Sequence, residues 1–90
     1  MAKKKSLLDQ MRENPRADWK IKDIEKLCSQ TGLSLDPPSH GSHFKIYSPH
    51  LRDVLTVPAR RPIKPPYIRN LVSFADAHYL AQEKGNQTDD

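Results

Sequence analysis

The stretch HGSHFKIY, residues 40–47, places a β-strand in the middle of this 90-residue chain. From His43 onward, apolar and polar side chains alternate, which is the two-residue period of a strand with one buried face. Phe44 and Ile46 would therefore point toward a core. The opposite, open face of the strand would carry His43, Lys45 and Tyr47.

Two shorter strand patterns lie on either side of this stretch. Leu33-Ser34-Leu35 alternates and then meets Pro37-Pro38, and because proline cannot donate to a β-ladder, this strand should lie on an edge or end early. Residues 53–58, DVLTVP, form the third pattern after the turn-like residues 48–52. The three patterns predict an antiparallel meander.

Helical patterns precede and follow the strands. A short helix from about residue 6 to 14 begins at Ser6, a suitable N-cap residue, and ends before Pro15. A second helix begins near Trp19 and stops at Gly32. Its apolar stripe recurs at intervals of three or four residues: Ile21, Ile24, Leu27 and Cys28. A third helix follows Pro65-Pro66, and its predicted buried stripe is Ile68, Leu71, Val72, Ala75 and Tyr79.

These elements predict a single α+β domain over residues 1–90, in the order α-α-β-β-β-α. The helices should pack on one face of a three-stranded antiparallel sheet, with the core spanning about residues 19–80. From about residue 82 to 90 the chain is polar and contains Gly85, so we expect a frayed tail.

The composition favours a polyanionic partner and a reducing compartment. The formal net charge of +4 and the pI of about 9.4 fit nucleic acid or an acidic protein equally well. Cys28 is the single cysteine of the sequence, so an intramolecular disulfide framework and a multi-cysteine zinc site are both excluded. Charged residues after Lys3–Lys5 interrupt any apolar signal region, and no apolar run is long enough to span a membrane. We therefore expect a cytoplasmic protein.

Three motifs follow one another in a distinctive order. Gly41-Ser42-His43 comes between a helix that ends in Thr31-Gly32-Leu33 and a strand, and it is followed by LTVP at 55–58 and IKPPYI at 63–68. In this order and spacing the motifs resemble the HicA family of bacterial toxins. The resemblance extends roughly from Trp19 to Leu80.

The resemblance implies a fold like a double-stranded-RNA-binding domain, ribosome-independent endonuclease activity on mRNA, and neutralisation by a HicB-type antitoxin protein. The family's essential histidine follows its Gly-Ser pair and corresponds to His43, which the turn at Gly41 and Ser42 would position. The sequence departs from the family at two places. Phe44 stands where many members have a second histidine, and Arg60 stands where many have a histidine after the third strand.

The chemistry of RNA cleavage suggests roles for the candidate residues. RNA carries its own nucleophile, the 2′-hydroxyl, so metal-free cleavage needs proton transfer and positive charge near the phosphate. An imidazole can transfer protons near neutral pH, and we hypothesise that His43 is the general acid or base. The candidates for binding phosphate or RNA are Lys45, Tyr47, Arg60, Arg61 and Lys64. The last three belong to a proline-rich connector just before a helix N-terminus, which also attracts phosphate.

Other interpretations of the same residues stay open. The chain could be a non-catalytic RNA-binding module in which His43 is incidental, or a cationic domain that docks an acidic protein. His40 fits an exposed turn residue better than a second catalytic group. The scattered spacing of the four histidines does not suggest a metal site, and no small-molecule cofactor is expected.

Overall fold

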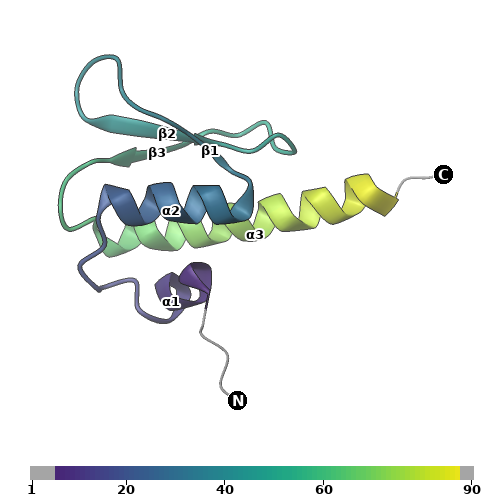
Figure 1. Ribbon diagram of the computed structural model, residues 1–90, viewed down its shortest axis with the longest axis horizontal. Coiled ribbons are helices and arrows are strands. Elements are labelled where there is room, and N and C mark those ends of the chain that lie inside the picture. The colour runs from purple at the N-terminus through teal and green to yellow at the C-terminus, as the bar shows by residue number, and fades with distance from the viewer. Residues whose placement is uncertain (1–5, 88–90) are drawn as a thin grey trace.

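The computed structural model describes residues 6–87, with side chains described for residues 6–83 (Figure 1). It contains three helices and three strands, in the order α1 (Leu7–Glu13), α2 (Ile21–Thr31), β1 (Ser34–Asp36), β2 (His43–Tyr47), β3 (Leu55–Pro58) and α3 (Pro65–Gln87). The predicted α+β class and order of elements are confirmed. The Lys3–Lys5 run lies outside the described residues. Helix α3 continues to Gln87, beyond the expected start of the polar tail at about residue 82.

The strands form one antiparallel sheet with β2 in the centre. Leu35 of β1 pairs with Ile46, and Pro58 at the end of β3 pairs with His43. The predicted alternation of β2 is confirmed, because Ile46 is fully buried and Phe44 is half-buried, whereas His43 and Lys45 are exposed on the other face. Tyr47 also belongs to that open face and is half-buried.

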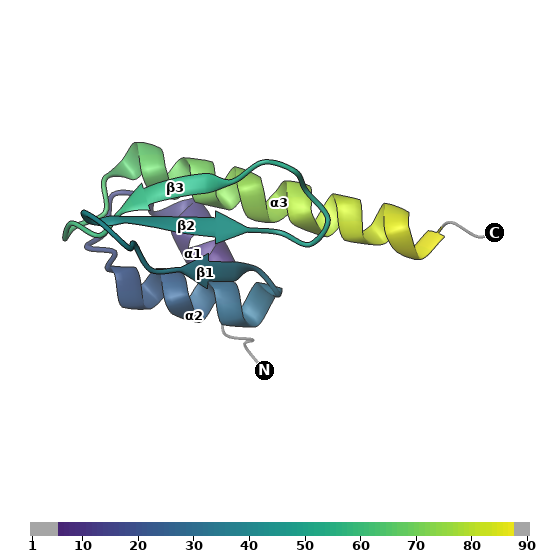
Figure 2. The ribbon, with the colours of Figure 1, turned by 90° about the horizontal axis from the view of Figure 1, so that it is seen from above.

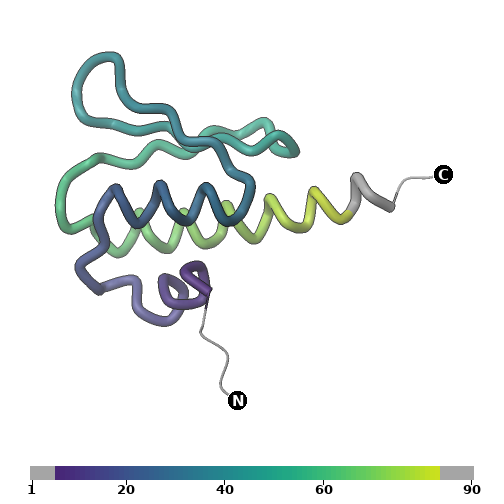
Figure 3. The backbone as a smooth tube through the Cα atoms, viewed as in Figure 1, coloured from purple at the N-terminus to yellow at the C-terminus, as the bar shows by residue number. Residues whose placement is uncertain are grey.

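The molecule has three layers. Helices α2 and α3 lie side by side under one face of the sheet and run in the same direction, α2 below β1 and α3 below β3 (Figure 2). Helix α1 lies on the far side of this helical layer, against α3 (Figure 1). The prediction that the helices cover one face therefore holds for α2 and α3, while α1 forms a layer of its own. The β1–β2 loop and the β3–α3 connector come together at the end where α2 and α3 begin (Figure 3).

Local signals in the sequence set the helix ends. The Ser6 hydroxyl accepts a hydrogen bond from the Asp9 amide at 3.1 Å, which caps α1. Gly32 ends α2 with a φ of 85°, a left-handed conformation that favours glycine. Between the caps, the core joins all three layers through fully buried apolar side chains, namely Met11, Ile24, Leu27, Ile46, Val57, Ile63, Ile68 and Leu71.

The predicted stripe of α3 is wrong at one position. Tyr79 is 40% exposed, and His78 is the buried residue in this turn, at 2% exposure. His78 Nε2 lies 2.8 Å from the Thr31 carbonyl oxygen at the end of α2, and Nδ1 lies 2.7 Å from the Ser48 hydroxyl after β2. Because a carbonyl only accepts, Nε2 carries the proton, and in the neutral ring Nδ1 accepts from Ser48. A polar ring is buried here because two polar groups of neighbouring elements need a partner.

Candidate active site

His43 is the first residue of β2 and is held by a tightly defined turn. Gly41 has a φ of 75°, which an L-residue with a side chain rarely adopts, so this position requires glycine. The carbonyl of Ser42 accepts a hydrogen bond from the Ala59 amide at 2.8 Å, so the pairing of β2 with β3 continues one residue past each strand. The turn before His43 therefore has a defined backbone geometry.

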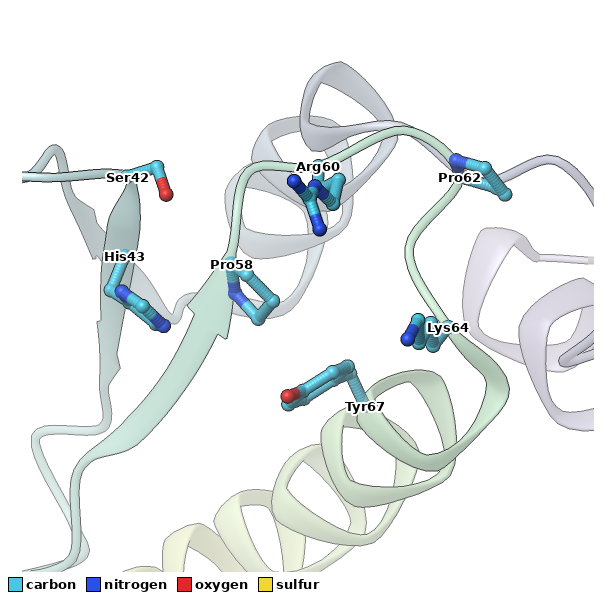
Figure 4. Close-up of a pocket in the computed structure, with 7 residues that line it drawn as sticks. All are labelled: Ser42, His43, Pro58, Arg60, Pro62, Lys64 and Tyr67. Atoms are coloured by element: carbon cyan, nitrogen blue, oxygen red, sulfur yellow. The ribbon is translucent and has the colours of Figure 1, made fainter.

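A cavity of about 270 Å³ lies beside His43, between β2, the connector and the first turn of α3 (Figure 4). We call it the basic hollow, and it is lined by Ser42, His43, Pro58, Arg60, Pro62, Lys64 and Tyr67. The amino group of Lys64 and the hydroxyl of Tyr67 point into the space that Arg60 and His43 also border (Figure 4). None of the seven lining residues is acidic, and two are cationic. The basic hollow therefore suits an anion such as a phosphate group.

The connector that carries Arg60 and Lys64 is anchored at several points. The Ile63 amide donates to the Trp19 carbonyl at 2.8 Å, and the Ile63 side chain is 1% exposed. Trp19 is itself fixed, because its indole N–H donates to the Asn14 carbonyl at 2.8 Å. Arg60 and Lys64 are thus presented by an ordered segment, which lowers the entropy cost of placing their charges around a ligand.

Arg61 does not line the basic hollow, although Arg60 and Pro62 on either side of it do. Its guanidinium meets the Asp18 carboxylate, with Nη2–Oδ2 at 2.8 Å and Nε 3.2–3.3 Å from the two carboxylate oxygens. This hydrogen-bonded pairing holds the pKa of Asp18 below its usual value and raises that of Arg61. Arg61 braces the connector against the segment before α2, and of the two arginines only Arg60 lines the basic hollow.

A second cavity of about 290 Å³ shares only His43 with the first. We call it the hairpin hollow, because the β1–β2 hairpin supplies its lining: Asp36, Pro37, Pro38, Ser39, His40, His43, Lys45 and Tyr47. The predicted residues therefore fall into two groups. Arg60 and Lys64 line the basic hollow, Lys45 and Tyr47 line the hairpin hollow, and His43 belongs to both.

Asp36 gives the hairpin hollow a different electrostatic character. It is the single acidic side chain among the residues that line either hollow. Partial burial, together with a hydrogen bond to Asp36, raises the pKa of the Tyr47 phenol above its usual value.

Sequence reasoning did not assign the polar lining residues Asp36 and Tyr67 to the candidate site. Asp36 directly follows the Leu33-Ser34-Leu35 strand pattern, which was the available signal, and in the structure it pairs with Lys45. Tyr67 lies outside the apolar stripe of α3. Its position in the first turn of a helix that follows a basic connector was the sequence signal that could have placed it at the cavity.

The N-terminus of α3 offers few amide donors to a ligand. Pro65 and Pro66 have no N–H, and the amides of Tyr67 and Ile68 both bond to the Lys64 carbonyl, at 3.0 and 3.3 Å. An anion in the basic hollow would therefore be bound mainly by side chains. Cys28 takes no part in the site, because its thiol is buried in the core and burial raises its pKa to about 11.

The described residues contain neither a metal cluster nor a membrane-spanning helix. In the described part of the chain, no three His, Cys, Asp or Glu side chains are grouped so that they could hold a metal ion. Among the helices within residues 6–87, none combines the length and apolar character needed to cross a membrane.

No family model matches the chain, and the searches of curated proteins and of solved structures found no significant match.

Proposed function

We propose that this chain is a metal-independent endoribonuclease in which His43 transfers a proton and the basic hollow binds the scissile phosphate. The proposal rests on one observation: the exposed His43 lines the same cavity as Arg60, Lys64 and Tyr67 (Figure 4). A histidine and two cations are the groups that metal-free cleavage of RNA requires.

The proposed reaction uses the substrate's own 2′-hydroxyl. The 2′-oxygen forms a bond to phosphorus and loses its proton, while the P–O5′ bond breaks and the 5′-oxygen gains a proton. His43 performs one of these transfers and a water molecule performs the other, while Arg60 and Lys64 neutralise the charge that grows on the phosphoryl oxygens. A single positioned acid or base accelerates a reaction by about 10²–10⁴-fold. The enzyme should therefore be slower than ribonucleases that use both a general acid and a general base.

We further propose the biological setting that the family resemblance implies. The α2-β1-β2-β3-α3 unit, with two parallel helices under one face of the sheet, is compatible with a fold like a double-stranded-RNA-binding domain. On this proposal the protein is the cytoplasmic toxin of a type II toxin–antitoxin system, acts on mRNA, and is neutralised by a HicB-type antitoxin. Growth arrest on expression, relieved by co-expression of a neighbouring gene, would support this setting.

The products of cleavage test the chemistry. The purified chain, incubated with a single-stranded RNA in EDTA, should yield fragments ending in 2′,3′-cyclic phosphate and 5′-hydroxyl. RNA binding without cleavage would replace the proposal with a non-catalytic RNA-binding module. Absence of RNA binding even at low salt, where phosphate contacts are strongest, would favour an acidic protein as the partner.

A further inference from the structure

We propose that the hairpin hollow is a nucleobase subsite selective for guanine, next to the phosphate bound in the basic hollow. This inference rests on the proposed ribonuclease function. It concerns the residues that the basic hollow does not use, above all Asp36 and Tyr47.

The two hollows adjoin at His43, so one RNA strand can occupy both of them. His43 is the one residue that lines both cavities. If the scissile phosphate occupies the basic hollow and reacts at His43, the adjoining nucleoside lies beyond His43, where the hairpin hollow opens. The hairpin hollow has a volume of about 290 Å³, similar to the 270 Å³ of its neighbour.

The charge of Asp36 argues that this second hollow receives a base and not another phosphate. A carboxylate repels phosphate and acts only as an acceptor, so its ligand must present hydrogen-bond donors. Guanine is the one common base with two adjacent donors on its Watson–Crick edge, N1–H and the 2-amino group. Adenine and cytosine each place an amino donor beside a ring acceptor, and uracil places one donor between two carbonyls. The two oxygens of a carboxylate match guanine alone with two parallel hydrogen bonds.

The remaining lining residues complete a base-binding surface. Tyr47 offers an aromatic face on which a base can stack, and it lines the hairpin hollow together with Asp36. Pro37 and Pro38 form another wall, with backbone torsions that are already restricted before the ligand arrives. Lys45 lies directly opposite Asp36 in the β-ladder, where it can contact a phosphate that flanks the base.

Base analogues at a mapped cleavage site test the two hydrogen bonds separately. Cleavage of a random-sequence RNA should concentrate at phosphates next to guanine. At such a site, inosine lacks the 2-amino group and 2-aminopurine lacks N1–H, and each should slow cleavage by about tenfold, as expected for one hydrogen bond to a charged group. Replacement by 7-deazaguanine, which keeps the same Watson–Crick edge, should leave the rate unchanged.

A substitution of Asp36 tests whether this residue causes the preference for guanine. Asp36→Asn should lose the preference for guanine and keep its cleavage at other sites, whereas Asp53→Asn, which alters an exposed carboxylate in the β2–β3 turn, should behave as wild type. Cleavage by the wild type without preference for guanine, or an Asp36→Asn protein that keeps the preference, would overturn the proposal.

Binding measurements keep the two proposals distinguishable. If the wild type cleaves no RNA, the ribonuclease proposal fails, and the subsite is then tested by titrating the protein with a guanine-containing oligonucleotide and its inosine counterpart. About tenfold tighter binding of the guanine form, lost in Asp36→Asn, would support the subsite. Equal affinities would overturn it.

Discussion

Arg60 and Arg61 are neighbours in the chain, but their side chains have different surroundings. Arg60 lines the basic hollow with Lys64, while Arg61 makes three close contacts, 2.8–3.3 Å, with the Asp18 carboxylate. The connector bends at Arg61 and Pro62, and one arginine faces the basic hollow while the next braces the connector. On the proposed function, Arg60 stabilises charge on phosphate and Arg61 maintains the connector's position.

Alanine variants of the two arginines should therefore behave differently. Arg60→Ala should lower the single-turnover cleavage rate by about 10–100-fold, because one cation is lost from the developing phosphoryl charge. Arg61→Ala should cause a much smaller loss, similar to that of Asp18→Ala, because both remove the same brace. Arg52→Ala, an exposed arginine in the β2–β3 turn, controls for net charge. Equal losses for Arg60→Ala and Arg61→Ala would contradict this division of roles.

At the scale of elements, helix α1 is joined to α3 by an ion pair as well as by apolar contacts. Arg12 donates two hydrogen bonds of 2.8 Å to the Asp76 carboxylate, and Leu8 and Met11 of α1 belong to the core. The hydrogen bonds from Arg12 hold the pKa of Asp76 below its usual value. A carboxylate whose pKa is lower in the folded state stabilises the fold above its unfolded pKa, and this contribution is lost as the pH falls through the folded pKa.

The docking of α1 should therefore weaken in acid. Wild type should exceed Asp76→Asn in free energy of unfolding at pH 6 by no more than about 1 kcal/mol, because both partners are nearly half exposed. The difference should shrink toward zero as the pH falls below about 4. Urea unfolding of both proteins between pH 6 and 3 measures it, with Asp53→Asn as a surface control. A difference that stays constant over this range would show that the ion pair does not contribute.

At the scale of the whole molecule, periodicity predicted the elements and their faces but not the polar pairings between them. The alternation of Phe44 and Ile46 was enough to separate the core from the open face of β2. Positions 78 and 79 of α3 both continue a helical stripe, and the Thr31 carbonyl and Ser48 hydroxyl decide between them in favour of His78. These partners are 47 and 30 residues away in the sequence, beyond the reach of local patterns.

The sequence likewise predicted part of the candidate site but not its polar pairings. Strand parity and the Gly-Ser turn indicated which residues share the open face with His43. Sequence alone could not show that Arg61 pairs with Asp18, 43 residues away, or that Tyr67 and Asp36 line the two hollows. Such placements depend on how the connector and the β1–β2 hairpin come together at one end of the molecule (Figure 3).

The proton-transfer role of His43 is the central claim, and one comparison of histidine variants tests it most directly. His50 is the matched control, because it is exposed and lies in the turn after β2, outside both hollows. In EDTA and under single-turnover conditions, His43→Ala should cleave RNA at least about 10²-fold more slowly than wild type, with RNA affinity retained, while His50→Ala should match wild type. A His43→Ala protein that cleaves RNA as fast as wild type would contradict the account.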